Sequence, residues 1–416
     1  MNMIPFGALL KRENKELSVV SYNILLPNNI DGWWIPKCYP PQTPMEHRTW
    51  SHRKKKLIDY LQNTSADIIC LQEVAQSSWE EDFQELTDKD YSGIIHSKNN
   101  LFRCATFYKE RHLNLLETRH SFRSLVHLFE GMHGTFGVIN VHLSGGPHPK
   151  TRMAQLQEAL KSLKKLAVSY QLDTNLLPII LCGDFNCNPQ NSPMSDFLFT
   201  GKLTPEERDP LYPDTALTKK GKKHAFSGFE SIYKKALGKS PPTLFGRPLI
   251  SVFCKQHTTQ ELLQARSNNK LASLINNETY MAIDSLFSIY EKGGIMDKEA
   301  CISWVKTING GLRGGEWKAV QNKNHTLRKQ DFIDIYIQNM NHGLWWSLAS
   351  DLEQHGISLP HECSEIYKDS LDHIFIRNCK PTGIQSPVLP TAIPNGLPCS
   401  DYPSDHIPVA AIVSLA

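Results

Sequence analysis

Two oxygen-bearing side chains come directly after a short apolar run near the middle of the chain. Residues 179–182 (IILC) predict a buried strand, Gly183 ends it, and Asp184 and Asn186 follow. Residues two apart in extended backbone project to the same side, so Asp184 and Asn186 share a side while Phe185 returns to the core. Such a pair can bind a hard cation or orient a water molecule. The same stretch taken alone is also typical of a strand followed by a turn.

Polar residues recur at the ends of other apolar, β-branched runs. They are Asn23 in 17–26, Glu73 in 67–74, His142 in 136–143, Asp372 in 370–377, and Asp405 with His406 just before the last strand. Taken singly, a buried Asn or His is more often a hydrogen-bonded core residue. Because mixed α/β sheets bring strand ends to one edge, we expect these side chains to converge on one pocket.

The chemistry of this pocket follows from its donor atoms. It is rich in carboxylate and amide oxygens and has no thiolate cluster, which favours Mg²⁺ or Mn²⁺ over zinc. A buried carboxylate is costly unless it is paired or bound to a metal. A magnesium ion bound by one or two carboxylates is the usual arrangement for phosphate-ester chemistry, and the two histidines could donate hydrogen bonds to phosphoryl oxygens.

Helices and further strands must position these residues. Apolar spacing predicts helices over 48–62, 151–170 and 226–237, a strand over 101–108, and a long loop over 27–44. Residues from 251 to about 348 are helical in pattern and poor in strands, so we interpret them as an insertion into the main domain. We expect three parts: 1–255 and 346–416 as the catalytic domain, and 256–345 as the helical insertion.

Composition limits the class of protein. The chain has 416 residues, 40% of them hydrophobic, which allows one large α/β domain with an insertion. The formal charge of +3 gives no indication of a broad polyanion-binding surface, although it leaves room for a local basic groove. No signal-peptide pattern, long apolar run or C-x-x-C pair occurs among the residues, so we expect an intracellular, cytoplasmic protein with reduced thiols and no transmembrane segment.

The motifs SYNILL, LQEV, NVHL, GDFN, LDHIF and PSDH, in this order, resemble the endonuclease/exonuclease/phosphatase superfamily of Mg²⁺-dependent phosphodiesterases. The resemblance covers roughly residues 17–255 and 346–416. Within the superfamily the chain looks most like the CCR4/nocturnin-type deadenylases, because of the gap from Asn23 to Glu73, the W-x-x-R at Trp50 and Arg53, the CATFYK strand and the proline-rich ending. The fold implied is a four-layer sandwich of two mixed β-sheets flanked by helices.

The resemblance also implies a role for each residue. Glu73 would be the principal metal ligand, assisted by Asn23 and Asp405. Asp184 would align or deprotonate the attacking water, and Asn186 would orient it. His142 and His406 would contact the scissile phosphate. Asp372 would fix the tautomer of His406 by a hydrogen bond to its ring. In-line water attack would then leave a 5′-phosphate.

Substrate identity stays open at this point. Deadenylases of the family usually carry an acidic residue where this chain has Arg103, which weakens the argument for poly(A). The leading expectation is a 3′-5′ exoribonuclease acting on RNA. The same core could act on 2′,5′-linked oligonucleotides, dinucleotides or phospholipid headgroups, and an inactive phosphate-binding adaptor is the alternative of another class. The presence of every site residue favours catalysis.

The helical insertion resembles a pair of EF-hands, as in some plant and protist members of the superfamily. Residues 280–310 and 317–343 each predict a helix, a short loop and a helix. The first loop has almost no correctly spaced carboxylate, and the second offers only Asn322, Asn324 and Asp331. We therefore do not expect Ca²⁺ there, and favour packing or a protein partner as the use of the insertion.

Overall fold

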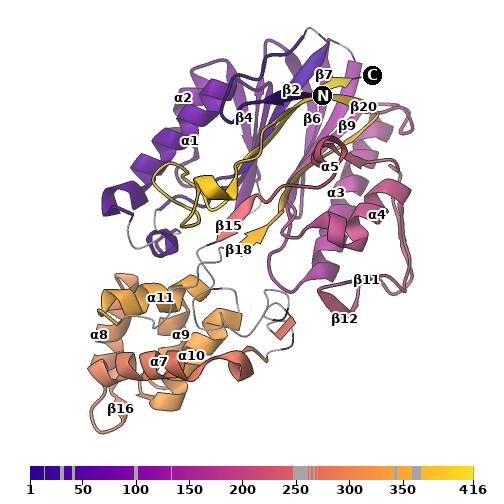
Figure 1. Cartoon of the computed structure of the whole chain (residues 1–416). Helices are drawn as coiled ribbons and strands as arrows, with labels where there is room; N and C mark the ends of the chain where they lie inside the picture. Colours follow the sequence, from indigo (N-terminus) through magenta and orange to yellow (C-terminus); the bar gives the residue numbers. More distant parts are fainter. Residues whose placement is uncertain are drawn as a thin grey trace.

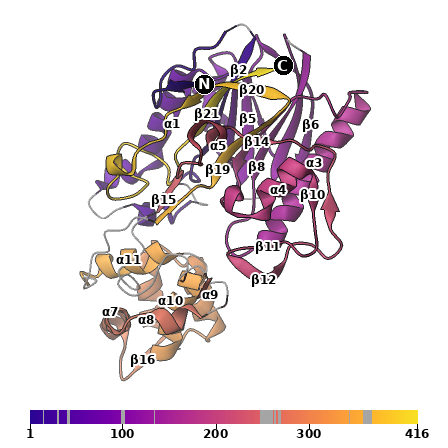
Figure 2. The same ribbon diagram turned by 45° about the vertical axis from the view of Figure 1, so that its right-hand side comes forward.

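The structure is a computed structural model, and it describes residues 1–13, 15–28, 32–39, 43–97, 102–132, 134–246, 261, 264–265, 268, 270–341, 344–357 and 367–415. Two large mixed sheets form its centre, with helices outside each (Figures 1 and 2). This confirms the predicted α/β sandwich.

The first sheet has seven strands, and its interior is built from both ends of the chain. In spatial order they are β1 (Asn2–Ile4), β20 (Cys379–Gln385), β21 (Val409–Leu415), β2 (Glu16–Asn23), β3 (Ile68–Val74), β5 (Arg103–Lys109) and β4 (Tyr91–Ile95). β2 and β3 run parallel, and β2 and β21 run antiparallel. Parallel pairing of β2 with β3 places the ends that carry Asn23 and Glu73 side by side.

The second sheet has six strands. They are β14 (Glu230–Ser231), β19 (Asp372–Arg377), β9 (Ile179–Asp184), β8 (Gly134–His142), β7 (Ser124–Gly131) and β6 (Leu113–Ser121). β8 and β9 are parallel, with His142 opposite Asp184. β19 is antiparallel to β9, with Asp372 opposite Asp184. Three predicted site residues therefore meet at one end of this sheet.

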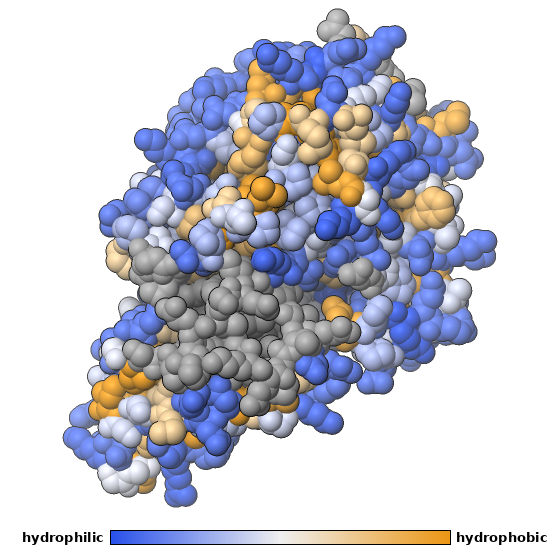
Figure 3. All heavy atoms as spheres, in the orientation of Figure 1, coloured by the Kyte–Doolittle hydropathy of each residue, from blue (hydrophilic) through white to orange (hydrophobic). Residues whose placement is uncertain are grey.

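Alternation along the strands explains the layers. On β2 and β3, Val19 and Cys70 face the second sheet, whereas Val20 and Ile69 face the outer helices. The outer helices of the first sheet are α1 (Trp50–Thr64) and α2 (Trp79–Thr87), and those of the second are α3 (Pro149–Ser169) and α4 (Pro193–Thr200). Hydrophilic residues cover the outer flanks of the molecule in the view of Figure 3.

Local sequence accounts for the two main helices. The Thr49 side chain caps α1 by accepting from the His52 N–H, and the left-handed Ser65 ends the helix. α3 lies so close to the sheet that a Cβ at Gly137 on β8 would be 2.8 Å from a Leu163 methyl. Gly137 therefore sets how closely α3 can approach the second sheet.

One predicted helix was wrong in its extent. The prediction was residues 226–237, whereas α5 spans only Ile232–Leu237 and follows strand β14. Gly228 has a positive φ of 85°, and Glu230 pairs with Ile376 of β19. Strand pairing with β19 therefore overrides the helical pattern of the first half, and the Ser231 side chain caps the shortened helix.

Short strands complete the main domain. They are β10 (Lys202–Leu203), β11 (Arg208–Asp209), β12 (Tyr212–Ala216), β13 (Lys222–Lys223), β15 (Leu244–Gly246) and β18 (Tyr367–Asp369). β15 and β18 pair antiparallel, and the helical insertion lies between these two strands in the sequence. The division at residues 255 and 345 stays a prediction, and residues 247–260 lie outside the described residues.

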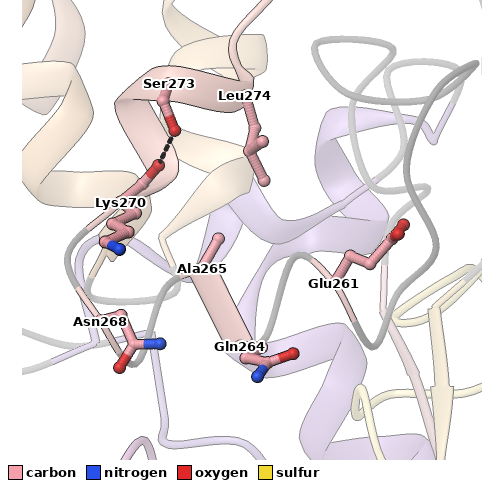
Figure 4. Close-up of a pocket in the computed structure, with 7 residues that line it drawn as sticks. All are labelled: Glu261, Gln264, Ala265, Asn268, Lys270, Ser273 and Leu274. Atoms are coloured by element: carbon pink, nitrogen blue, oxygen red, sulfur yellow. Dashed lines mark hydrogen bonds between the residues drawn. The ribbon is translucent and has the colours of Figure 1, made fainter.

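The insertion has its own apolar core. Its helices are α7 (Asn277–Tyr290), α8 (Lys298–Asn309), α9 (Gly314–Asn322) and α10 (Lys329–Asn341). α11 (Trp345–Gln354), which continues past the predicted boundary at residue 345, packs against the same core. The loop strands β16 (Ile295–Met296) and β17 (Leu327–Arg328) pair antiparallel. In the second loop, the Asp331 carboxylate lies 2.6 Å from the Lys323 ammonium. The EF-hand resemblance stays a prediction, and a cavity of about 360 Å³ beside Lys270 and Leu274 (Figure 4) contains none of the predicted site residues.

A buried lysine joins the insertion to the main domain. Lys37 lies in a short 3-10 helix, Ile35–Cys38, and its Nζ is 2.9 Å from Asp351 Oδ1 and 2.8 Å from Asn309 Oδ1. The side chains of Lys37 and Asp351 are 8% and 0% exposed. Tyr336 donates a hydrogen bond to the second Asp351 oxygen. The ion pair thus fixes α11 against the loop that follows β2.

Candidate active site

The structure brings all eight predicted site residues to one end of the two sheets. They are Asn23, Glu73, His142, Asp184, Asn186, Asp372, Asp405 and His406. Strand pairing places Asp184 opposite both His142 and Asp372, so the ends of these strands meet at one edge of the sheet. These residues form one polar cluster between the sheets, which we call the strand-end site.

Asn23 connects the two sheets at the centre of the strand-end site. Its Nδ2 donates to Glu73 Oε1 at 3.2 Å and to Asp184 Oδ2 at 3.0 Å. The second Glu73 oxygen accepts from the Leu26 N–H at 3.2 Å. One amide therefore sits between a carboxylate of the first sheet and a carboxylate of the second.

Glu73 owes its direction to an irregularity in β3. The ladder between β3 and β5 shifts register between Leu71 and Val74, and Glu73 has a positive φ of 63°. A bulge of this kind re-aims a side chain, and left-handed backbone at a residue other than glycine is strained. Burial raises the pKa of Glu73, and the nearby Asp405 raises it further. The fold thus maintains a strained, buried carboxylate at this place.

His142 lies beside both carboxylates. Its Nε2 is 3.6 Å from Asp184 Oδ2 and 3.8 Å from Glu73 Oε1, and the Phe102 ring stands perpendicular to it. Burial, together with the charges of Arg123 and His406, lowers the pKa of His142 to about 3. His142 is therefore a neutral ring that can donate or accept, but does not carry charge.

His406 has the opposite electrostatic environment. Its Nδ1 is 2.7 Å from Asp372 Oδ2, and its Nε2 is 4.0 Å from Asp405 Oδ1. Burial lowers the pKa of His406, but Asp372 and Asp405 outweigh burial and raise it well above its usual value. His406 is thus a cation whose Nδ1–H donates to Asp372, which leaves Nε2–H to face the strand-end site.

Asn186 is held by the turn after β9. Its N–H donates to Asp184 Oδ1 at 2.7 Å, and its Nδ2 donates to Leu143 O at 2.9 Å and to Asp184 Oδ2 at 3.1 Å. Its φ of 51° is left-handed, which Asn tolerates better than most residues. Burial raises the pKa of Asp184, and the nearby Asp372 adds to this effect. The GDFN turn therefore orients both Asp184 oxygens.

Arg53 supports the strand-end site from α1, a role that the sequence argument did not assign. The guanidinium is buried and donates to the carbonyls of Ile24, Leu25, Leu26 and Pro403. It thereby ties the loop after Asn23 to the loop before Asp405. The W-x-x-R pattern was the available signal, and the Trp50 ring lies 5.0 Å from the Arg53 guanidinium. Ser404 adds a second tie by donating to Asn23 O at 2.7 Å.

The donor set fits a divalent cation with an open coordination shell. Glu73 and the nearby Asp405 supply carboxylates and Asn23 an amide oxygen, while Asp372 already pairs with the cationic His406. This buried negative charge calls for a cation. Among the described residues, no three His, Cys, Asp or Glu side chains gather closely enough to enclose a metal. Mg²⁺ suits such a site, since it keeps several waters and needs one or two carboxylates.

Comparison with known proteins finds relatives over nearly half of the chain. Carbon catabolite repressor protein 4 homolog 6 of Arabidopsis thaliana is 28% identical over 220 residues, which are 46% of this chain and 28% of that protein. The CCR4-Not complex 3′-5′-exoribonuclease subunit Ccr4 of Saccharomyces cerevisiae is 26% identical over 237 residues, 45% of this chain and 27% of that protein. The chain thus matches well under half the length of these relatives.

The fold has solved counterparts. A crystal structure of ANGEL2, described as a 2′,3′-cyclic phosphatase, aligns with 96% of this chain and 95% of that chain at a TM-score of 0.57 and 17% identity. The model of the Endonuclease/Exonuclease/phosphatase family matches residues 20–406, which include Asn23, Glu73 and His406. With the family model spanning both sheets and the strand-end site, this chain belongs to the endonuclease/exonuclease/phosphatase family.

Proposed function

We propose that this protein is a Mg²⁺-dependent phosphodiesterase that cleaves RNA by in-line attack of water, as a 3′-5′ exoribonuclease of deadenylase type. The observation that most supports this proposal is the arrangement of the strand-end site. Asn23 joins Glu73 and Asp184 across the two sheets, and a cationic His406 lies beside them. Opposed carboxylates and a fixed imidazolium are what phosphoryl transfer needs for positioning and charge stabilisation.

Each residue has a proposed step. Asp184 accepts the proton of the attacking water, and Asn186 orients that water. His406 donates its Nε2–H to a phosphoryl oxygen as negative charge builds, while Asp372 keeps its other nitrogen protonated. His142 contributes a further hydrogen bond to the phosphoryl group from its neutral ring. The steps need no covalent intermediate, since water is the nucleophile.

The cation site is centred on Glu73 in this proposal, with Asn23 and Asp405 helping to order it. When bound, Mg²⁺ or Mn²⁺ would supply Lewis-acid stabilisation of the phosphoryl oxygens. The bulge that aims Glu73 and the Leu26 N–H that holds one of its oxygens fix this carboxylate before any ligand arrives. Preorganisation of this kind lowers the cost of reaching the transition state.

RNA is favoured as substrate by the curated relatives, several of which are described as 3′-5′ exoribonuclease subunits of the CCR4-Not complex. Arg103 is the chain's own departure from the family. Its guanidinium donates to Gln76 Oε1 and to His96 O, both at 2.7 Å. Arg103 pairs with Val74, the residue after Glu73, in the β3–β5 ladder, so it is a residue to vary when the preference for adenosine is tested.

The test is digestion of 5′-labelled RNA with Mg²⁺, comparing twenty adenosines with a mixed sequence of equal length. We expect a ladder that shortens from the 3′ end, abolished by EDTA and by Asp184→Asn. A folded, metal-binding protein that leaves both RNAs intact would refute the RNA assignment. The same preparation would then be assayed on 2′,5′-linked oligonucleotides, dinucleotides and phospholipid esters, and inactivity on all of them would leave the phosphate-binding adaptor.

A further inference from the structure

Lysine side chains gather on the outer side of α3 and on the short ribbon beside it. We call this set the α3 lysine surface; it comprises Lys150, Lys161, Lys202, Lys222 and Lys223. The run 219–223 (KKGKK) places further lysines in the turn that leads to β13. Figure 2 shows α3, α4 and β10 together at one side of the molecule.

Geometry brings these lysines close to one another. Lys150 and Lys161 are eleven residues apart on α3, which at 100° and 1.5 Å per residue places them on one side of the helix, about 16 Å apart. Gln157 on the same side donates to Lys223 O, so the ribbon lies against this side of α3. Burial lowers the pKa of Lys222, and the charges of Lys161 and Lys150 lower it further. All three ammonium groups therefore share one region of the surface.

The lysines of this surface repel one another. Lys202 lies directly opposite Lys223 in the β10–β13 ladder, and like charges in that arrangement are destabilising. Over the ranges that the structure describes, none of the five lysines forms an ion pair with a carboxylate. Glu158 is the one acidic residue of α3; it lies about 80° around the helix from Lys150, but only three residues before Lys161, where it offsets part of the positive charge. A polyanionic ligand would relieve this repulsion.

An exposed aromatic ring lies in the helix that leads into the lysine-bearing ribbon. Phe199 lies at the end of α4, is 59% exposed, and precedes Lys202 by three residues. Its carbonyl accepts from the Gly228 N–H at 2.7 Å, which fixes the backbone beside the ribbon. Lysines that track a backbone, with an aromatic ring on which a base can stack, are the features of single-stranded nucleic acid binding.

A short loop connects the strand-end site to the first turn of α3. Leu143, whose carbonyl accepts from Asn186, is followed by the short loop that leads into α3 at Pro149. Arg152 on the first turn of α3 donates to Ser144 O and Gly146 O and so holds this loop. Lys150 therefore lies at the beginning of a path that runs from the strand-end site along α3.

We propose that the α3 lysine surface binds the phosphate backbone of a single-stranded RNA whose 3′ end lies in the strand-end site, with Phe199 stacking on a base. This inference rests on the proposed function for its choice of RNA. It assigns a substrate-binding path outside the cleavage site, so long RNAs should bind more tightly than dinucleotides.

The test compares two triple variants of equal charge change. K161Q/K222Q/K223Q removes the centre of the surface, and K298Q/K306Q/K318Q removes three exposed lysines of the insertion as the matched control. Anisotropy of a labelled 20-mer RNA, measured with EDTA to prevent cleavage, gives affinity and its salt dependence. We expect the first variant to bind about tenfold or more weakly at 0.15 M salt and to lose about two units of slope in log K against log salt. The control should match the wild type.

Cleavage separates this inference from the proposed function. The first variant should show a raised KM for the 20-mer and unchanged rates on a dinucleotide. F199A should weaken binding of the 20-mer and leave the rate on the dinucleotide unchanged. Equal binding and salt slopes in both triple variants would overturn the inference even if the wild type cleaves RNA. RNA binding that depends on these lysines without any cleavage would support the surface and refute the proposed function. If the first triple variant lost binding to anionic phospholipid vesicles but still bound RNA as the wild type does, the inference would also be overturned.

Discussion

Lys37→Met tests the attachment of the helical insertion. The substitution removes one partner of a buried ion pair, and Asp351 would remain buried beside Glu316 and Tyr336. Stranding a buried charge costs about 3–5 kcal/mol in the free energy of unfolding, whereas replacing both partners by apolar residues is often neutral. We therefore expect a loss of about 3–5 kcal/mol for Lys37→Met. Recovery in Lys37→Met/Asp351→Leu should be partial, because the Tyr336 hydroxyl and Asn309 Oδ1 each lose a hydrogen-bond partner.

The assay is thermal unfolding followed by tryptophan fluorescence, with limited proteolysis to locate the loosened region. A loss of this size lowers the unfolding temperature by roughly 10 °C. Lys329→Met is the control, since Lys329 and Asp284 form an ion pair of 2.6 Å whose side chains are 55% and 39% exposed. Its removal should cost less than about 1 kcal/mol.

The pH dependence has a definite sign. Burial raises the pKa of Asp351 to about 6, although Lys37 lowers it. Without Lys37 the pKa of Asp351 rises further. Once Asp351 is protonated it is neutral, so the loss of Lys37 no longer leaves a buried charge without a partner. The deficit of Lys37→Met should therefore shrink as the pH falls from 8 to 5. A deficit equal to that of Lys329→Met, or a double variant as unstable as Lys37→Met, would refute the reasoning.

Three further predictions concern the strand-end site and the core. Glu73→Ala should lower turnover by about 100-fold or more, with partial rescue by high Mg²⁺ or Mn²⁺ in a steady-state assay, because the main metal ligand is lost; full activity without added metal would exclude that role. Arg53→Lys keeps the charge but not the forked hydrogen bonds to two loops, so kcat should fall about tenfold to 100-fold while far-UV circular dichroism stays unchanged. Burial lowers the pKa of His127 to about 3, so the stability gained by keeping it neutral is present above pH 6.5 and is lost as the pH falls towards 3; urea midpoints of His127→Gln should fall less steeply over that range than those of the wild type.

The sequence was sufficient for the features that rest on local pattern. Alternating apolar runs predicted the main strands, and polar residues at their ends predicted the members of the strand-end site, because parallel neighbours such as β8 and β9 align their ends. Contacts between distant segments were not predictable. Arg53 is one basic residue in a lysine-rich helix until its carbonyl partners come into place, and the helical pattern of 226–237 gives no sign that β19 will pair with Glu230.

Lys37 illustrates the same limit from the other side. In the sequence it belongs to a proline-rich loop and looks solvent-exposed, yet its two acceptors, Asn309 and Asp351, come from the insertion. A single residue separated from both partners by most of the chain carries no periodic signal. The anchor could be found only from the folded structure.

The order of the strands has a consequence for synthesis of the protein. β19 lies between β14 and β9, and β21 lies between β20 and β2, so each large sheet has an interior strand that is encoded after the insertion. A nascent chain that ends at residue 360 can complete neither sheet, although the local contacts of α7 to α10 allow the helices to form. Until β21 and β19 are synthesised, one edge of β2 and one edge of β9 have no partner strand. The chain is therefore most prone to aggregation during this interval.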